Sequence, residues 1–111
     1  MFVCQHGALR SRLAAAFFNA VAPAGWHAIS AGFTPQSEVS ARLMPLLKGT
    51  GVEEFADLEP PRLFDPGAAD RAISIDEPIG GVERWRTSGS DEQVRDQIRN
   101  AVALLVQDLD E

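Results

Sequence analysis

The first 21 residues constrain the fold most, because they read as a buried strand, a short loop and a helix in direct succession. Residues 1–4 form an apolar run, and the loop after it contains Gly7. Over residues 11–21, apolar side chains recur at helical spacing, and Pro23 ends the pattern. A strand that leads through a tight loop into a helix is the first half of a β-α-β unit, so the sequence predicts a parallel sheet.

The rest of the chain continues this alternation of strands and helices. Apolar runs predict further strands at residues 26–30 and 71–75. Between them, residues 38–48 show a helical pattern, and we expect Pro45 to kink this helix or to remove one hydrogen bond from it. The sequence therefore predicts an α/β fold with a parallel sheet.

The last helix has the clearest pattern in the second half of the chain. Prolines in residues 52–69 and glycines in residues 76–89 predict that both stretches are mostly loop. Ser90 then stands three residues before Gln93, the arrangement of a capping box at a helix start. One apolar stripe follows, formed by Val94, Ile98, Val102, Leu105 and Leu109. We find no linker, so one domain over residues 1–111 is expected.

Composition excludes several classes of protein. Hydrophobic residues make up 45% of the chain and charged residues 23%, which is typical of a soluble globular protein. The formal net charge of −6 argues against nucleic-acid binding, and it means that any anion site must be built locally. No apolar run reaches the about 20 residues that cross a membrane. Cys4 is the only cysteine, so an internal disulfide is excluded and a cytoplasmic location is expected.

The loop between the first strand and the first helix is the best candidate for a functional site. Backbone N–H groups of a loop that enters a helix converge on one point and bind anions, assisted by the helix dipole. The Arg10 guanidinium can hold two oxygens of an oxyanion at once. Cys4 lies at the base of the same loop, where these groups would favour its nucleophilic thiolate form. The expected binding residues are Gln5, His6, Gly7, Ala8, Leu9, Arg10 and Ser11.

The pattern Cys-x5-Arg-Ser directly after the first strand resembles the phosphate loop of the low-molecular-weight protein tyrosine phosphatase and arsenate reductase superfamily. Ser30, Ala31 and Gly32 match a Ser-Ala-Gly sequence that this superfamily commonly carries at its second strand. The resemblance implies the phosphotyrosine phosphatase I-like fold, an α/β three-layer sandwich whose small parallel sheet has about four strands. It also implies that Cys4 is the nucleophile, that Arg10 binds the oxyanion, and that the Ser11 hydroxyl stabilises the thiolate.

Three departures from the superfamily pattern bear on activity. Gly7 replaces an Asn whose side chain ties the loop together. Residues 85–90, where the phosphatases carry an Asp-Pro general acid, contain neither Asp nor Pro. The chain has no tyrosine to frame the pocket, and we interpret Trp85 as a packing residue. Among the remaining carboxylates, Asp76 is our candidate for the catalytic acid, with Asp91 as a substitute.

The sequence therefore supports one leading function and two alternatives. The first is a phosphatase that hydrolyses phosphate esters through a phospho-cysteine at Cys4. The second is an arsenate reductase that uses an external small thiol, because the chain lacks the further cysteines of a thioredoxin-coupled relay. The third is a phosphate-binding domain of the same fold without turnover. None of them requires a metal or another cofactor, and the expected ligands are phosphate, arsenate or a phosphorylated substrate.

Overall fold

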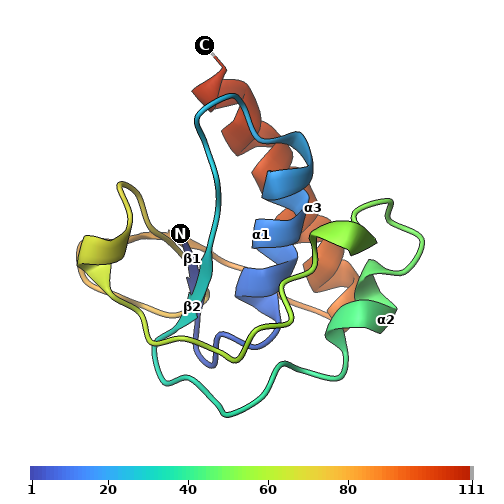
Figure 1. Ribbon diagram of the computed structural model, residues 1–111, viewed down its shortest axis with the longest axis horizontal. Helices are drawn as coiled ribbons and strands as arrows, with labels where there is room; N and C mark the ends of the chain where they lie inside the picture. Colours follow the sequence, from blue (N-terminus) through green and yellow to red (C-terminus); the bar gives the residue numbers. More distant parts are fainter. Residues whose placement is uncertain (111) are drawn as a thin grey trace.

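The computed structural model describes residues 1–110 and contains a four-stranded parallel sheet (Figure 1). Its strands are β1 (Phe2–Cys4), β2 (Ser30–Gly32), β3 (Ile73–Ile75) and β4 (Glu83–Trp85). They lie in the order β2-β1-β3-β4, and each neighbouring pair is parallel. The predicted fold class, α/β with a small parallel sheet, is confirmed.

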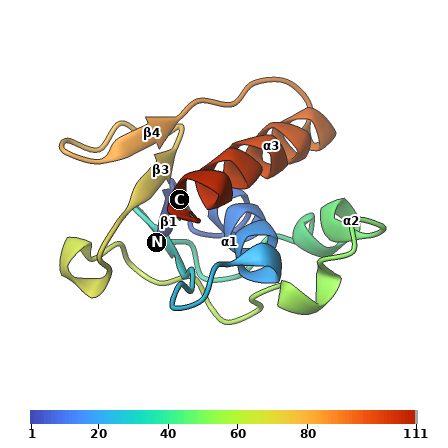
Figure 2. The same cartoon turned by 90° about the horizontal axis from the view of Figure 1, so that it is seen from above.

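Three α-helices pack beside this sheet. They are α1 (Arg10–Val21), α2 (Leu43–Leu47) and α3 (Asp91–Leu109), with two short 3₁₀ helices, η1 (Glu53–Phe55) and η2 (Pro66–Ala68), between α2 and β3. Figure 2 shows α1 and α3 side by side on one side of the sheet, with α2 beyond α1. Since β1 leads directly into α1, the loop between them emerges at the carboxyl edge of the sheet, where α/β proteins bind ligands.

Helix α1 is the centre of the core. Every side chain from residue 11 to residue 18 is buried, because the helix contacts the sheet on one side and α3, α2 and η1 on the others. Its apolar residues pack with Ile75 of β3 and with the buried stripe of α3, whose members are Val94, Ile98, Val102 and Leu105. Removing this much apolar surface from water is the main stabilising contribution, and it fixes the loop at the start of α1.

The second strand begins later than predicted. Residues 26–29 form an irregular connection, because the Asn19 side chain of α1 binds both the N–H and the carbonyl of Ala28. Pairing with β1 starts only at Ser30, which lies opposite Phe2, and it ends with β1 itself at Cys4. The Ser-Ala-Gly sequence is therefore the strand.

Two further predictions are corrected. The helix expected at residues 38–48 is only Leu43–Leu47, and Pro45 lies in its first turn, where a proline N–H is not needed. Residues 76–89 are not all loop, since β4 forms within them as a short, partly exposed edge strand. Its sequence, Glu-Arg-Trp, has no apolar alternation that would indicate a strand.

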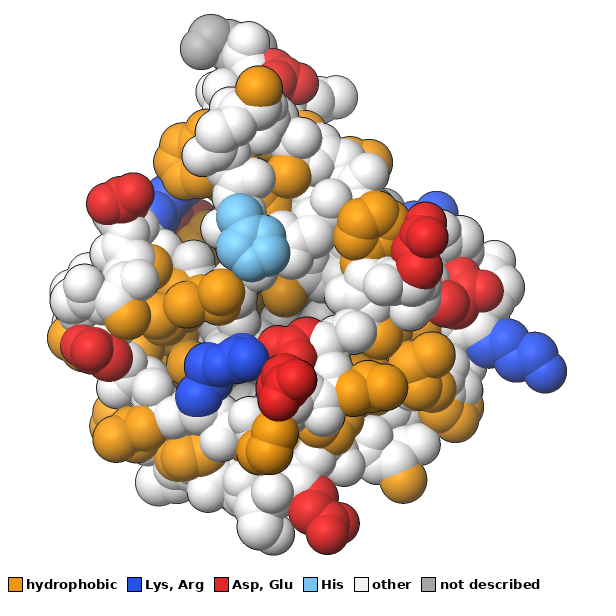
Figure 3. Space-filling view, viewed as in Figure 1, with side chains coloured by type: hydrophobic (Ala, Val, Ile, Leu, Met, Phe, Trp, Pro, Cys, Tyr) orange, Lys and Arg blue, Asp and Glu red, His pale blue; other side chains and the backbone are white. Residues whose placement is uncertain are grey.

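The start of α3 is confirmed in detail. Ser90 Oγ accepts from the N–H of Gln93 at 3.2 Å, and the Gln93 side chain accepts from the N–H of Ser90 at 2.8 Å. Among residues 1–110, no helix combines the length and the apolar character needed to cross a membrane. On the face drawn in Figure 3, basic side chains are scattered among acidic ones and form no continuous patch.

Candidate active site

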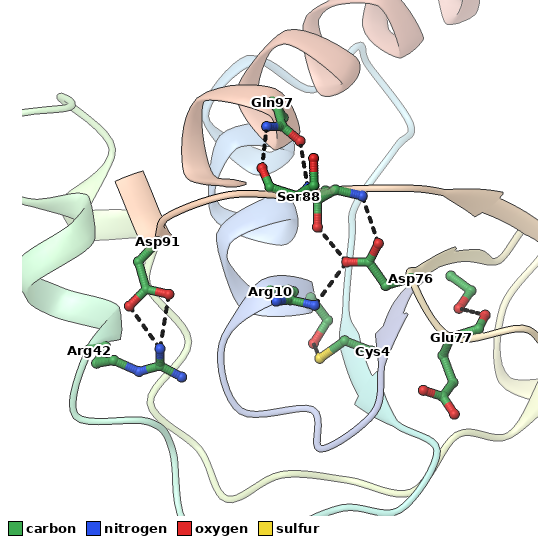
Figure 4. Close-up of polar contacts among 11 residues, drawn as sticks. Cys4, Arg10, Arg42, Asp76, Glu77, Ser88, Asp91 and Gln97 are labelled. Carbon is green, nitrogen blue, oxygen red and sulfur yellow. Dashed lines mark hydrogen bonds and ion pairs between the residues drawn. The ribbon is translucent and has the colours of Figure 1, made fainter. Parts of the chain in front are cut away.

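A pocket of about 320 Å³ opens at the carboxyl edge of the sheet, above the loop between β1 and α1. It brings together the three predicted catalytic residues, Cys4, Arg10 and Asp76 (Figure 4). No Phe, Tyr or Trp side chain belongs to its described lining. Its other lining residues are Gln5, His6, Ala8, Leu9, Gln36, Ser40, Arg42, Ile75, Glu77 and Asp91.

In the loop between β1 and α1, the backbone carbonyls are hydrogen-bonded and the N–H groups are free, as far as the described residues go. The carbonyls of Cys4, Gln5, His6 and Ala8 accept hydrogen bonds from backbone N–H groups of residues 33–40. Within residues 1–110, by contrast, no N–H of residues 5–9 donates a hydrogen bond to another group. The acceptors are thus tied to the surrounding chain while the donors stay available, which is the arrangement that binds an anion.

Two glycines allow this loop to lie against β2. Gly7 has a φ of 64°, and a Cβ placed on it would come within 2.7 Å of the Gly32 nitrogen. A Cβ on Gly32 would in turn come within 2.7 Å of the Gly7 nitrogen. The Ser-Ala-Gly sequence therefore has a structural role, since its glycine gives the loop room to pass.

Cys4 is buried at the base of the pocket and bonded to Ser11. The thiol donates to Ser11 Oγ over 3.2 Å, and Ser11 itself is fully buried behind the loop. A hydroxyl is both donor and acceptor, so Ser11 can donate to the sulfur once the thiol has lost its proton. This is the contact that the sequence resemblance implies for these two residues.

Arg10 and Asp76 form an ion pair at the pocket mouth. Arg10 Nη1 lies 2.9 Å from Asp76 Oδ2, and both side chains are partly exposed. Asp76 also accepts from the backbone N–H and from the hydroxyl of Thr87. Thr87, in the segment between β4 and α3, thus holds the Asp76 side chain in place beside Arg10.

The remaining predicted residues lie in or behind the loop. The His6 ring turns outward, with its Nδ1 3.2 Å from the carbonyl oxygen of Thr34, so only the backbone of His6 serves the site. Trp85 packs against Phe2 with ring centroids 5.5 Å apart, as a packing residue does. Within residues 1–110, no cluster of three His, Cys, Asp or Glu side chains is placed to hold a metal ion.

Sequence reasoning named Asp91 but missed two arginines at this site, Arg12 and Arg42. Arg12 lies under the loop with no exposed side-chain surface, and it binds the Gly7 carbonyl and the carbonyl of Asp57. Arg42 and Asp91 form an ion pair of 2.8 Å on the far rim of the pocket. Arg12 lies next to the last residue of the motif. An arginine on a helix is usually exposed, so in the sequence only the adjacent run of alanines indicated that Arg12 is buried.

Burial sets the electrostatics beneath the loop. It lowers the pKa of the Arg12 guanidinium below its ordinary value, and the nearby Asp57 carboxylate opposes this shift. Partial burial raises the pKa of Asp57, but hydrogen bonds from the N–H of Glu59 and from Arg62 outweigh it and leave that pKa lowered. Asp57 is therefore held as an anion between two arginines.

Comparison with solved structures places the chain in a family. An arsenate reductase from Archaeoglobus fulgidus is 31% identical, over 96% of this chain and 97% of that one, with a TM-score of 0.75. The chain belongs to the superfamily of low-molecular-weight protein tyrosine phosphatases and arsenate reductases. The superfamily predicted from the loop motif is thereby confirmed.

Two further members of the superfamily differ in how much they share. A thioredoxin-dependent arsenate reductase from Corynebacterium glutamicum is 27% identical over 98% of this chain and 60% of that one, with a TM-score of 0.77. A low-molecular-weight protein tyrosine phosphatase from T. tengcongensis shares the fold, with a TM-score of 0.77 and 16% identity over 96% of each chain. No protein-family model matches the sequence, and no curated protein matches it either.

Proposed function

We propose that this chain is an enzyme that transfers a tetrahedral oxyanion to Cys4, and that arsenate is its substrate. The observation that carries the proposal is the hydrogen bonding of the loop backbone. Its carbonyls are bound to the surrounding chain, its N–H groups are available, and Cys4 and Arg10 line the same pocket. Such a site holds an oxyanion against a thiol in the geometry of a displacement reaction.

The first step forms a covalent bond between Cys4 and arsenic. The thiolate attacks arsenate, an S–As bond forms, and one oxygen leaves as water after taking up protons. The loop N–H groups bind the charge on the remaining oxygens. Arg10 joins them by exchanging its ion pair with Asp76 for the arsenate, which its exposed position allows.

The second step reduces arsenic with an external thiol. The sulfur of that thiol attacks Cys4 Sγ, so that an S–S bond forms and the S–As electron pair stays on arsenic. As(V) leaves as arsenite, As(III), and the two sulfurs are oxidised to a mixed disulfide. A second external thiol then reduces the disulfide and releases Cys4. Since Cys4 is the only cysteine, no resolving cysteine can come from this chain.

Three observations favour arsenate over a phosphate ester. Departure of an alkoxide or phenoxide gains roughly 10²–10⁴-fold from a general acid, whereas the candidate acid Asp76 is already engaged by Arg10 and Thr87. The described pocket lining includes no Phe, Tyr or Trp side chain that could stack on a tyrosyl ring. The solved structures of 31% and 27% identity are also both arsenate reductases.

A phosphatase is the second candidate, and the position of Asp76 favours it. When Arg10 turns to a bound phosphate, Asp76 keeps only its Thr87 contacts and lies at the pocket mouth, where its carboxyl can face the leaving oxygen. Asp76 would then protonate the leaving oxygen, and water would later hydrolyse the phospho-cysteine. In this reaction no external thiol is consumed.

The two candidates are separated by turnover assays on one preparation. Arsenate-dependent oxidation of a small thiol such as glutathione is followed together with hydrolysis of an aryl phosphate. We expect thiol oxidation by the wild type and by Lys48→Ala, an exposed control, and none by Cys4→Ser. Ester hydrolysis without thiol oxidation would establish the phosphatase instead. Binding of both anions with neither reaction would reduce the site to a phosphate-binding domain.

A further inference from the structure

Arg12 holds a loop carbonyl that no backbone N–H of residues 1–110 binds. The carbonyls of Cys4, Gln5, His6 and Ala8 accept from backbone N–H groups, which only a substitution to proline removes, and the Gln5 carbonyl also accepts from the Thr34 hydroxyl. The Gly7 carbonyl is bound by a side chain instead, at 2.7 Å from Arg12 Nε. One peptide of the loop therefore depends on the identity of residue 12.

That peptide is the one most free to rotate. Gly7 has a φ of 64° and no Cβ, so its backbone has wider conformational freedom than that of its neighbours. The C=O and N–H of a trans peptide point in opposite directions. A contact that holds the Gly7 carbonyl beneath the loop consequently aims the N–H of Ala8 toward the pocket.

The far end of Arg12 is anchored. Its Nη1 donates to the carbonyl of Asp57 at 2.6 Å, and Asp57 is paired with Arg62 at 2.9 Å. Arg62 in turn donates to the carbonyl of Ser30 at 3.0 Å, in the strand that lies against the loop. The network is closed, because it runs from the loop through Arg12 and residues 57–62 to β2 and back to the loop.

Folding stability gives a poor explanation for this arginine. Its side chain has no exposed surface, burial lowers its pKa, and its Nη2 has no hydrogen-bond partner among residues 1–110. A buried cation of this kind costs desolvation that an apolar side chain of similar length does not.

We infer that Arg12 is a positioning residue for the oxyanion site: its Nε holds the Gly7 carbonyl down and thereby presents the Ala8 N–H to the bound anion. This inference rests on the proposed function, because it assumes that the loop binds an oxyanion. It assigns to Arg12 a support for the loop that Gly7, which has no side chain, does not supply.

Two variants separate the hydrogen bond from the charge. Arg12→Gln places an amide nitrogen at the chain position of Nε, so it keeps the donor to Gly7 and removes the charge. Arg12→Met has similar length but no donor. The matched control is Arg95→Met, because Arg95 also donates to a backbone carbonyl, that of Leu46, and lies outside the pocket.

The measurement is protection of Cys4 from iodoacetamide by inorganic phosphate and by arsenate. We expect wild type, Arg12→Gln and Arg95→Met to require similar anion concentrations. Arg12→Met should require about tenfold more, the equivalent of one hydrogen bond to a charged group. Equal weakening of the Gln and Met variants would assign the effect to the rest of the guanidinium, its charge or its bond to Asp57, and overturn the inference. Arg12→Met binding like wild type would overturn it too.

The wild type alone also tests the inference, should Arg12→Met not fold. In ¹H–¹⁵N spectra, the Ala8 amide resonance should show a large shift on addition of phosphate, larger than that of Ala31 in β2. An unshifted Ala8 amide in a protein whose Cys4 is protected would overturn the role of Arg12 and leave the proposed site intact. Failure of both anions to protect wild-type Cys4 would overturn the proposed function and this inference together.

Discussion

At the scale of single residues, the site depends on two positions with positive φ, Gly7 at 64° and Asp76 at 66°. Glycine adopts this conformation without strain, and aspartate and asparagine adopt it more readily than other residues with a side chain. Gly7 lets the loop pass β2, and Asp76 turns the chain after β3 so that its carboxylate meets Arg10.

Substitution of Gly7 by alanine should remove the site. The new Cβ would lie 2.7 Å from the Gly32 nitrogen, so the loop must move away from β2. We expect Gly7→Ala to lose phosphate protection of Cys4 and to lower the free energy of unfolding by more than the roughly 1 kcal/mol of backbone strain alone. Gly51→Ala measures that strain, since Gly51 has a φ of 87° with open space around it. If Gly7→Ala and Gly51→Ala lower the free energy of unfolding in urea by the same amount, the proposed clash between residue 7 and Gly32 is contradicted.

Substitution of Asp76 by asparagine should strengthen anion binding. Asparagine tolerates positive φ and can keep the contact with the Thr87 N–H, but it releases Arg10 from an ion pair. We expect phosphate to protect Cys4 at several-fold lower concentration. Asp91→Asn removes the same charge from the same pocket but frees Arg42, so it should have a smaller effect. If both variants gain anion affinity equally, the effect comes from removing a negative charge from the pocket and not from releasing Arg10.

The sequence predicted some of these residues and not others for a physical reason. Cys4, Arg10 and Ser11 belong to one contiguous loop, whose geometry follows from the strand before it and the helix after it. Asp76 was one of several carboxylates until the turn after β3 placed it in the pocket. Arg12 was invisible because its role comes from burial against Asp57, a residue 45 positions away.

At the scale of elements, the long helices and the buried strands β1 and β3 were predictable, while the limits of β2 and the presence of β4 were not. Helices α1 and α3 carry many periodic apolar side chains, and α3 adds its capping box. Strand β4 has no apolar pattern that identifies it, and β2 begins later than its apolar run indicates. Their limits are set by the partner strand, since pairing stops where β1 or β3 ends.

The capping box gives a prediction for α3. Ser90→Ala removes the side-chain acceptor of the Gln93 N–H and should lower the free energy of unfolding by about 1 kcal/mol. Chemical denaturation measures this loss, with the exposed Ser37→Ala as the comparison. Asp91 and Thr87 flank this helix start. If Ser90→Ala changes the protection of Cys4 by phosphate but not the free energy of unfolding, the cap serves to position the site and not to stabilise the helix.

At the scale of the whole molecule, Asp57 links its stability to pH. The pKa of Asp57 lies below its ordinary value of 3.8, so folding favours the carboxylate. Its contribution is therefore complete above that value and is lost as the pH falls through the folded pKa. We expect the difference in stability between wild type and Asp57→Asn to be largest near neutral pH and to shrink below pH 3.8. Thermal unfolding across this range measures it, and a difference that grows in acid would exclude the pairing with Arg62.

The dependence of the loop on residues 33–40 has a practical consequence. The Cys-x5-Arg-Ser motif contributes the N–H donors of the site, but residues 33–40 hold the loop in its conformation. The motif alone, transferred to another protein, would therefore not bind an anion. A single proteolytic cut within that stretch would release the loop carbonyls, so the loop would lose the conformation that leaves its N–H groups available. Anion binding would then be lost although every residue of the superfamily motif remained in place.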